Sequence, residues 1–181
     1  VGALKFRKGY HVSIPAIAEV KKHYPEIKYC IVGDQSGLKY FNELKKLVRE
    51  NDMENNVEFL SGLSDQDLRS LYCECDLFLL LSVNEGYSFE GFGLVHLEAN
   101  ACGRPSIGTL GCGSEDAIKD GCSGFLVPQN NIKAASEAVL KILGDSKLAG
   151  ELGQNSYLWA KANTWEKTAK KYVDVYEKLI K

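Results

Sequence analysis

The segment LFLLLSVNEGYSFEGFGLVHLEANAC, residues 77–102, is the most informative part of this sequence. Its first five residues, Leu77–Leu81, form an unbroken apolar run with the length of a buried strand. A glycine-rich loop follows, and Leu94–Cys102 then has the composition of a helix. A strand, a loop and a helix in this order are the repeating unit of a parallel sheet covered by helices.

The same alternation continues outward from this segment in both directions. Six short apolar segments predict strands: Val1–Leu4, Lys28–Val32, Val57–Leu60, Leu77–Leu81, Pro105–Gly108 and Gly124–Val127. Longer amphipathic segments predict helices: His11–Tyr24, Leu38–Asn51, Ser64–Cys75, Leu94–Cys102, Ser114–Asp120, Ile132–Gly144, Leu148–Ala162 and a Thr164-capped helix through Ile180. We therefore expect an α/β domain with a doubly wound, Rossmann-like parallel sheet of about six strands and C-terminal helices. Such sheets bind ligands beyond the carboxyl ends of their strands.

The composition of the 181-residue chain argues against several functions. A net charge of −2 gives no basic surface for nucleic acid, and no apolar run has the roughly 20 residues that span a bilayer. The six cysteines include no Cys-x-x-Cys pair, so we expect reduced, buried thiols in a cytoplasmic protein. Because Val1–Leu4 has the composition of a core strand without an initiator Met before it, we expect the chain to be part of a longer protein.

Glu98 is the first candidate site residue. Its neighbours three and four residues away on the predicted helix are all apolar: Leu94, Val95, Ala101 and Cys102. This pattern predicts that the Glu98 carboxylate faces the core. A buried carboxylate needs a hydrogen-bond donor, either a protein group or a pair of ligand hydroxyls.

Gly91 and Gly93 are the next candidates. They precede the predicted helix, where bare backbone N–H groups and the helix dipole attract an anion. A phosphate at this end of the helix and a carboxylate further along it suit a nucleotide. The alternative is a glycine turn that merely begins a helix. We expect His96, on the same helix, to be a packed or surface residue rather than a base.

The spacing of Glu90 and Glu98, with seven residues between them, resembles the E-x7-E signature of the group 1 retaining glycosyltransferases. Further segments resemble other parts of this family in the same order: Val1-Gly2 with Lys8-Gly9, Ile31–Gly33, Val57–Gly62, Glu98–Pro105, Gly111–Glu115 and Gly121–Val127. The family has the GT-B fold, in which the site lies between two Rossmann-like domains. The resemblance implies that this chain is the C-terminal, nucleotide-sugar-binding domain, and that the N-terminal acceptor domain is absent from it.

The resemblance also implies a role for each matching residue. Glu90 would bind hydroxyls of the donor sugar near the reacting centre, and Lys8 would neutralise the leaving nucleoside diphosphate, so these two are the expected catalytic residues. Glu98 would bind the ribose hydroxyls. The remaining expected donor-binding residues would hold the diphosphate or lie near the base: Gly91, Phe92, Gly93, Leu94, Leu60, Ser61, Gly62, Leu63 and Gly33.

The reaction implied by the resemblance transfers a sugar from a nucleoside-diphosphate sugar to a glycan, lipid or other acceptor, with retention at the anomeric carbon. We expect no cofactor and no metal, because a lysine and helix amides can stabilise the charge on the leaving diphosphate. The expected partners are the nucleotide sugar and the N-terminal domain. That domain could also place the full-length protein at a membrane surface, whereas the isolated domain should have negligible transferase activity.

The chain departs from the family pattern in two places. Ala3 stands where family members commonly carry an arginine, five residues before the lysine, although Arg7 lies close by. The segment Ser82–Phe89 is longer than in common members and contains Glu85, a poorer match to the first acid of the motif. A catalytically decayed module that binds a nucleotide or a glycan is therefore an alternative function. A nicotinamide-dependent oxidoreductase domain is a weaker one, because the first loop, Lys5–Gly9, lacks Gly-x-Gly-x-x-Gly.

Overall fold

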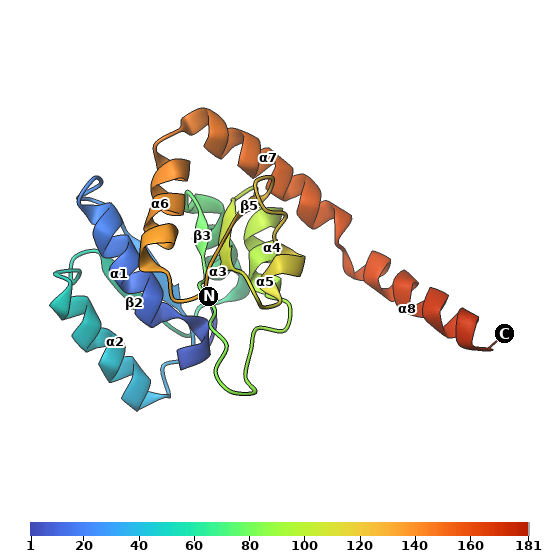
Figure 1. Ribbon diagram of the computed structural model, residues 1–181, viewed down its shortest axis with the longest axis horizontal. Coiled ribbons are helices and arrows are strands. Elements are labelled where there is room, and N and C mark those ends of the chain that lie inside the picture. The colour runs from blue at the N-terminus through green and yellow to red at the C-terminus, as the bar shows by residue number, and fades with distance from the viewer. Residues whose placement is uncertain (181) are drawn as a thin grey trace.

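Parallel strand pairing organises the computed structural model, which describes residues 1–180 (Figure 1). The strands are β1 (Tyr29–Val32), β2 (Val57–Leu60), β3 (Phe78–Leu79), β4 (Ser106–Thr109) and β5 (Gly124–Val127). Strand β1 pairs with β2 in one sheet, and β4 lies between β3 and β5 in the other. Every pairing is parallel, so the carboxyl ends of the strands meet at one edge of each sheet. The predicted α/β class with parallel strands is confirmed.

The prediction of about six strands in one sheet is wrong for residues 1–180, which contain five strands in two sheets. The segment Val1–Leu4 is not a strand. Its backbone still runs beside the end of β1, where the Gly2 amide donates to the Val32 carbonyl at 2.8 Å and the Leu4 amide to Asp34 at 3.1 Å. The segment reaches only the carboxyl end of β1, and this contact is too short to join the two sheets.

A cavity of about 830 Å³ lies between β1 and β3. Apolar residues from both strands and from two helices line it: Val32, Phe78, Leu79, Ile17 and Val139. The facing edges of the two sheets therefore border this cavity rather than each other.

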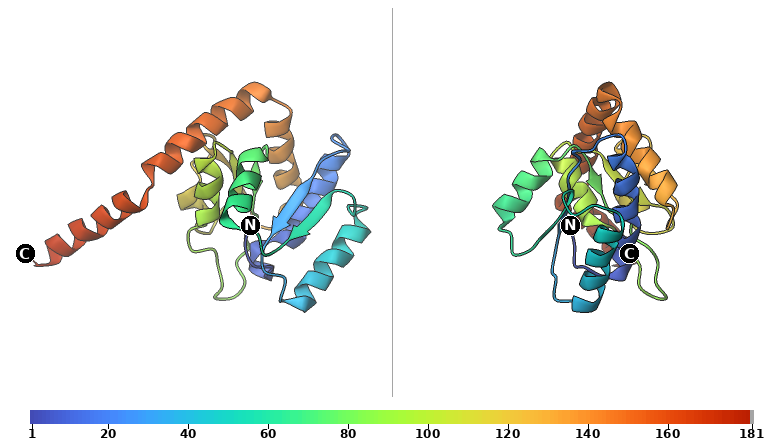
Figure 2. Two further views of the ribbon diagram at one scale, coloured as in Figure 1. Left: turned by 180° about the vertical axis from the view of Figure 1, so that it is seen from behind. Right: turned by 90° about the vertical axis from the view of Figure 1, so that its left-hand side faces the viewer.

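Helices lie on both faces of the strands (Figure 2). They are the 3-10 turn η1 (Phe6–Lys8), α1 (Tyr10–Lys21), α2 (Leu38–Glu50), α3 (Asp65–Glu74), α4 (Leu94–Ala101), α5 (Ser114–Ala117), α6 (Ile132–Leu143), α7 (Ser146–Ala162) and α8 (Trp165–Ile180). The side chains of Ser64, Asn131 and Asp145 each accept a hydrogen bond from a first-turn amide, which fixes the start of α3, α6 and α7. The predicted helices are confirmed, with ends that differ by a few residues.

Strand β4 is buried along its whole length and lies in the core. Helix α1 packs against α6, and α4 packs against α7. Strands β3 and β4 are buried at every position, whereas β1 and β2 each have one exposed residue, Cys30 and Glu58. Loops at the carboxyl ends of these strands carry the candidate site residues.

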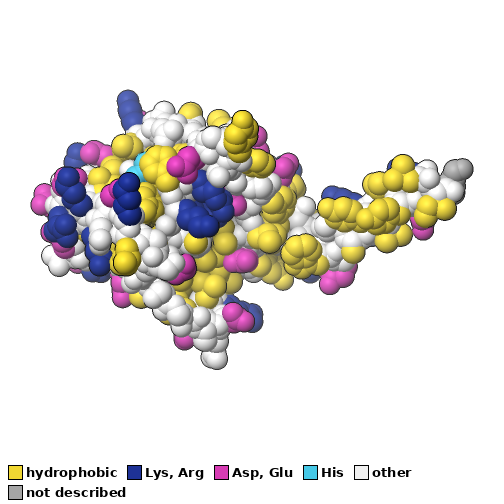
Figure 3. All heavy atoms as spheres, turned by 90° about the horizontal axis from the view of Figure 1, so that it is seen from below, with side chains coloured by type: hydrophobic (Ala, Val, Ile, Leu, Met, Phe, Trp, Pro, Cys, Tyr) yellow, Lys and Arg dark blue, Asp and Glu magenta, His cyan; other side chains and the backbone are white. Residues whose placement is uncertain are grey.

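Helix α8 projects away from the rest of the molecule (Figures 1 and 2) and has no buried residue. Its exposed apolar residues are Trp165, Tyr172, Val173, Val175, Tyr176, Leu179 and Ile180. Figure 3 shows the apolar surface that they form along the projecting helix. Among residues 1–180, no helix combines the length and apolar character needed to cross a membrane.

The prediction that the cysteines are buried is wrong. Cys30 and Cys73 are exposed, and the other four are half-buried: Cys75, Cys102, Cys112 and Cys122. All six are free thiols. The apolar sequence around them indicated burial, but several lie at the ends of helices and strands, where solvent reaches the sulfur.

Candidate functional site

A buried ion pair joins the two residues expected to be catalytic. The Nζ atom of Lys8 lies 2.6 Å from Oε2 of Glu90, and each residue is only 8% exposed. The same oxygen accepts hydrogen bonds from Ser82 Oγ at 3.1 Å and from Arg7 Nη1 at 3.3 Å. These donors offset the cost of burying a carboxylate and hold Glu90 in one position. Sequence reasoning missed Ser82, which had no signal beyond its place after an apolar run.

Gly9 explains how Lys8 reaches Glu90. Its backbone is left-handed, with φ of 68°, and a Cβ atom there would lie 1.7 Å from the carbonyl oxygen of Leu81. The contact continues at Val83, whose amide donates to the Arg7 carbonyl at 2.8 Å. The loop before α1 is thus fixed onto the segment that follows β3, and both basic side chains lie over the loop that carries Glu90.

The glycine-rich loop before α4 is in backbone contact with a second loop. The Gly113 amide donates to the Glu90 carbonyl at 2.7 Å, and a Cβ atom on Gly113 would lie 2.3 Å from the backbone of Gly91. Gly93 is the N-cap of α4, is left-handed with φ of 82°, and has no side chain with which to cap the helix. The first-turn amides, beginning at Leu94, therefore form a positive helix end suited to an anion.

Glu98 is exposed, so the prediction that its carboxylate faces the core is wrong. Helix α4 packs against α7 and β4, and this packing buries His96, Ala99 and Asn100 instead. The hydroxyl of Tyr72, on α3, donates to Glu98 Oε2 at 2.8 Å. Burial and this hydrogen bond raise the pKa of Tyr72, so the phenol keeps its proton. Tyr72 is a second residue that sequence reasoning missed, because nothing in the sequence paired α3 with α4.

His96 is a packed core residue, as expected. It is fully buried, its ring lies against Phe78 with 5.2 Å between ring centroids, and its Nε2 atom lies 3.3 Å from Ser114 Oγ. Burial lowers the pKa of His96 to about 3. The imidazole is therefore neutral at physiological pH and anchors α4 beneath the loop.

The segment expected near the base lies at the carboxyl ends of β1 and β2. The Gly33 amide donates to the Leu60 carbonyl at 2.9 Å, and a Cβ atom on Gly33 would lie 1.9 Å from the Gly2 carbonyl oxygen. Ser61 and Gly62 are exposed. Within residues 1–180, no hydrogen bond or ion pair joins this segment to Glu90. The candidate donor-binding residues thus form separate groups along the carboxyl edge.

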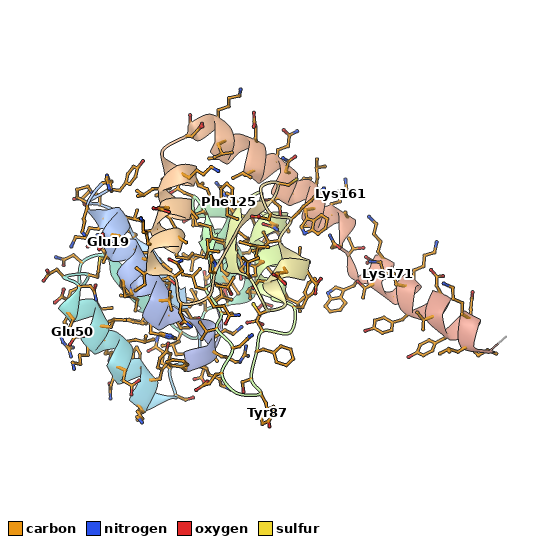
Figure 4. All side chains as sticks on the ribbon, viewed as in Figure 1. Glu19, Glu50, Tyr87, Phe125, Lys161 and Lys171 are labelled. Atoms are coloured by element: carbon orange, nitrogen blue, oxygen red, sulfur yellow. The ribbon has the colours of Figure 1, made fainter. Side chains whose placement is uncertain are left out.

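The loop Ser82–Phe89 extends outward below the strands, and Tyr87 lies at its tip (Figure 4). The Glu85 amide and the Ser88 carbonyl close the loop with a 2.8 Å hydrogen bond. Glu85 is exposed, whereas Glu90 is buried in its ion pair. This difference favours Glu90 over Glu85 as the first acid of the motif.

The site therefore combines two basic side chains, an open helix end and an exposed carboxylate. No group of three or more His, Cys, Asp or Glu residues in the described part of the chain is arranged to hold a metal ion. The basic side chains and helix amides are groups that bind phosphate, and the Glu98 carboxylate can accept hydrogen bonds from hydroxyls.

Related sequences identify the family. The sequence profile described as "Glycosyl transferases group 1" matches residues 1–159. The D-inositol 3-phosphate glycosyltransferase of Corynebacterium urealyticum is 33% identical over 183 residues, which cover 99% of this chain and 42% of that protein. A GDP-mannose-dependent alpha-(1-6)-phosphatidylinositol monomannoside mannosyltransferase of Mycolicibacterium smegmatis is 29% identical, over 88% of this chain and 41% of the length of that protein. The chain thus spans about two fifths of these relatives.

Solved structures share the fold. Sucrose-phosphate synthase from Thermosynechococcus elongatus superimposes with a TM-score of 0.85 at 27% identity, over 99% of this chain and 44% of that one. The C-terminal domain of the group 1 glycosyl transferase LpcC from Francisella tularensis superimposes with a TM-score of 0.79 at 25% identity, over 90% of this chain and 83% of that one. HepE of Anabaena, solved with UDP-glucose, superimposes with a TM-score of 0.80 at 26% identity, over 89% of this chain and 43% of that one. This chain belongs to the group 1 glycosyl transferase family and corresponds to the C-terminal domain of the two-domain GT-B fold.

Proposed function

We propose that this chain is the nucleotide-sugar-binding domain of a retaining glycosyltransferase, which transfers a sugar from a nucleoside-diphosphate sugar to a glycan, lipid or other acceptor. The observation that carries this proposal is the buried Lys8–Glu90 pair next to the uncapped start of α4. The Cγ atom of Glu90 lies 3.7 Å from the position of a Cβ atom on Gly93, so the acid adjoins the helix end. The HepE structure with UDP-glucose supports this class of ligand.

The diphosphate would bind at the start of α4. Backbone amides of Phe92, Gly93 and Leu94 would donate to its oxygens, and the helix dipole would add to the attraction. Lys8 would neutralise the charge that develops when the nucleoside diphosphate leaves. Arg7 lies beside the same carboxylate and would supply a second cation, which offsets the Ala3 departure from the family pattern.

The two acids would bind the sugars at either end of the diphosphate. Glu90 would accept hydrogen bonds from the transferred sugar, because only Oε2 is engaged by Lys8, Arg7 and Ser82 in the described residues. Glu98 is exposed and would bind the ribose hydroxyls. The segment Leu60–Leu63 and Gly33, at the neighbouring strand ends, would lie near the base.

In the proposed reaction, the bond between the anomeric carbon and the diphosphate oxygen breaks, and the diphosphate leaves with the electron pair. The acceptor oxygen then bonds to the anomeric carbon on the same face and gives its proton to an oxygen of the departing diphosphate. Lys8, Arg7 and the amides of α4 stabilise the departing charge, and this electrostatic contribution is the main one that the domain makes. The acceptor would be positioned by the N-terminal domain.

We also propose that the full-length protein completes this domain. A strand from the segment upstream of Val1 would fill the cavity between β1 and β3 and join the two sheets into the doubly wound sheet of about six strands. The hydrogen bonds of Gly2 and Leu4 to the end of β1 already have the spacing of a parallel ladder. The apolar face of α8 would pack on the N-terminal domain. A cytoplasmic location, with peripheral membrane contact through that domain, stays a prediction.

Calorimetric titration of the domain with UDP, GDP and NAD tests the proposal. We expect one of the nucleoside diphosphates to bind and NAD not to bind. Binding by NAD alone would contradict the proposal, and so would the absence of binding by every nucleoside diphosphate, with ADP, CDP and dTDP added to the series.

Ala3 favours a second candidate function, a module that binds a nucleotide sugar without transferring the sugar. A donor screen on the full-length protein distinguishes the two candidates. Release of nucleoside diphosphate together with a glycosylated product supports transfer, whereas tight donor binding without turnover supports the decayed module. We expect negligible transfer by the isolated domain in either case.

A further inference from the structure

Two thiols from different helices are in contact on the surface. The sulfur of Cys73, in the last turn of α3, lies 3.0 Å from the sulfur of Cys102, which directly follows α4. Cys73 is exposed and Cys102 is half-buried. A disulfide has a sulfur–sulfur distance of about 2.05 Å, so a movement of about 1 Å would bring the two sulfurs to bonding distance.

Neighbouring contacts hold the two helices in this arrangement. The Tyr72 hydroxyl, adjacent to Cys73, donates to Glu98 Oε2 at 2.8 Å. On the other side, the guanidinium of Arg104 donates to the carbonyl of Cys73. Both contacts cross from α3 to the segment that carries Cys102, so the thiols face each other without any rearrangement of the backbone.

The remaining cysteines differ from this pair. Within residues 1–180, no other hydrogen bond joins two cysteine sulfurs. The Cys75 thiol donates to the Tyr72 carbonyl at 3.4 Å, and the Cys112 thiol donates to the Thr109 carbonyl at 3.4 Å. These thiols are held by backbone oxygens, whereas Cys73 and Cys102 are held by each other.

We propose that Cys73 and Cys102 form a reversible disulfide under mild oxidation, a modification site that the proposed transferase chemistry does not use. The ring closed by this bond contains the whole segment from β3 to α4, including Glu90 and Glu98. Oxidation would therefore fasten α3 to the end of the helix on which the candidate site is built. The proposal stands independently of which nucleotide sugar the domain binds.

The oxidant would be a small disulfide such as oxidised glutathione. The exposed Cys73 thiolate attacks it, forms a mixed disulfide and releases one glutathione thiol. The Cys102 thiolate then attacks the Cys73 sulfur and releases the second glutathione thiol, so two electrons pass from the protein to the small disulfide. Cys73 is the exposed thiol of the pair, so it meets the small disulfide first. Burial, with the Cys73 hydrogen bond as the next cause, raises the pKa of Cys102 to about 11.

Thiol counting on the full chain tests this proposal. The protein is equilibrated with oxidised glutathione, quenched in acid, alkylated under denaturing conditions and analysed by intact and peptide mass spectrometry. We expect four alkylated cysteines instead of the six in the reduced chain, with Cys73 and Cys102 in one cross-linked peptide. The oxidised form should also melt roughly 5–10 °C higher, because the cross-link restricts the unfolded chain. Dithiothreitol should restore all six thiols.

Two variants sharpen this test. Cys102→Ser should retain a glutathione adduct at Cys73, because the second displacement is lost. Cys30→Ser removes another exposed thiol and should still form the cross-link. Six reactive thiols in excess oxidised glutathione, a stable adduct on Cys73 in the unsubstituted chain, or a cross-link to Cys75 would each overturn the proposal.

Discussion

The two acids of the motif, Glu90 and Glu98, are held in opposite ways. Glu90 is buried, and one of its oxygens accepts hydrogen bonds from Lys8, Arg7 and Ser82. Glu98 is exposed and accepts from Tyr72 within the described residues. The first acid belongs to an internal ion pair, whereas the second is a surface group with capacity left for a ligand. Substitution of Glu90 should therefore affect stability most, and substitution of Glu98 should affect binding most.

Removal of the Glu90 carboxylate should have the largest effect on stability. Glu90→Ala leaves the Lys8 ammonium in a buried position without its carboxylate partner. We expect the free energy of unfolding to fall by about 3 kcal/mol, which is typical when one partner of a buried pair is removed. Urea denaturation followed by circular dichroism measures this change.

The exposed Glu85, five residues earlier, provides the matched control for Glu90. Glu85→Ala removes a carboxylate from the same loop but breaks no ion pair, so its unfolding free energy should change by less than about 0.5 kcal/mol. Equal stability of the Glu90→Ala and Glu85→Ala variants would show that the Lys8–Glu90 pair does not hold the loop in place.

The next largest effect should come from His96, which lies on α4 between the two acids. Burial lowers its pKa to about 3, whereas a histidine in the unfolded chain titrates near 6.5. Between these pH values the unfolded chain binds more protons, so stability falls as the pH decreases from 6.5 toward 3. The contribution of His96 alone should lower the free energy of unfolding by about 2 kcal/mol when the pH falls from 7 to 5.

NMR titration of the histidine ring protons checks this prediction directly. The His96 signals should not shift above pH 4. The exposed His23 offers a control position for substitution. A His23→Gln variant should retain the pH dependence of the urea midpoint. A His96 signal that titrates near pH 6 in the folded protein would rule out the buried neutral ring.

Glu98→Ala should separate binding from stability. The exposed carboxylate contributes little to packing, so the unfolding free energy should change by less than about 1 kcal/mol. The affinity for the nucleoside diphosphate should fall about tenfold, because the proposed hydrogen bonds from ribose hydroxyls to this charged acceptor would be lost. Calorimetric titration measures the affinity, and Glu137→Ala, on the exposed face of α6, is the control. A purely structural Glu98 would give the reverse pattern, with stability reduced and affinity intact.

The pairing of Lys8 with Glu90 shows how far the sequence could predict the site. The family pattern identifies both residues, but as groups with separate roles. Their direct contact depends on Gly9, which lets the first loop approach Leu81 closely. The sequence shows a glycine at this position but not what it lies against, so it could not show that the two side chains meet.

Glu98 shows where helix-pattern reasoning failed. Its apolar neighbours Leu94 and Ala101 indicate burial of this helix face, yet both are exposed. The buried face of α4 was set by its packing on α7 and β4, a tertiary choice that a short helix with few polar residues does not specify. The strand prediction for Val1–Leu4 is wrong for a related reason. The segment has strand propensity, but a strand also needs a neighbouring strand along its length. For longer elements such as α6 and α7, which have clear caps, the sequence pattern predicts helices that agree with the structure.

The smallest effect should come from the hydroxyl of Tyr72. Tyr72→Phe removes the hydrogen bond to Glu98 but keeps the ring packed against Phe78. Because water can replace the donor at an exposed carboxylate, we expect a stability loss of about 0.5–1 kcal/mol and a change in nucleotide affinity of less than about threefold. Tyr176→Phe, on the exposed helix α8, controls for loss of a hydroxyl elsewhere. Suppose that Tyr72→Phe weakened nucleotide binding as strongly as Glu98→Ala. Glu98 would then need its tyrosine partner to hold its position, as Glu90 needs Lys8. The two acids would differ only in burial.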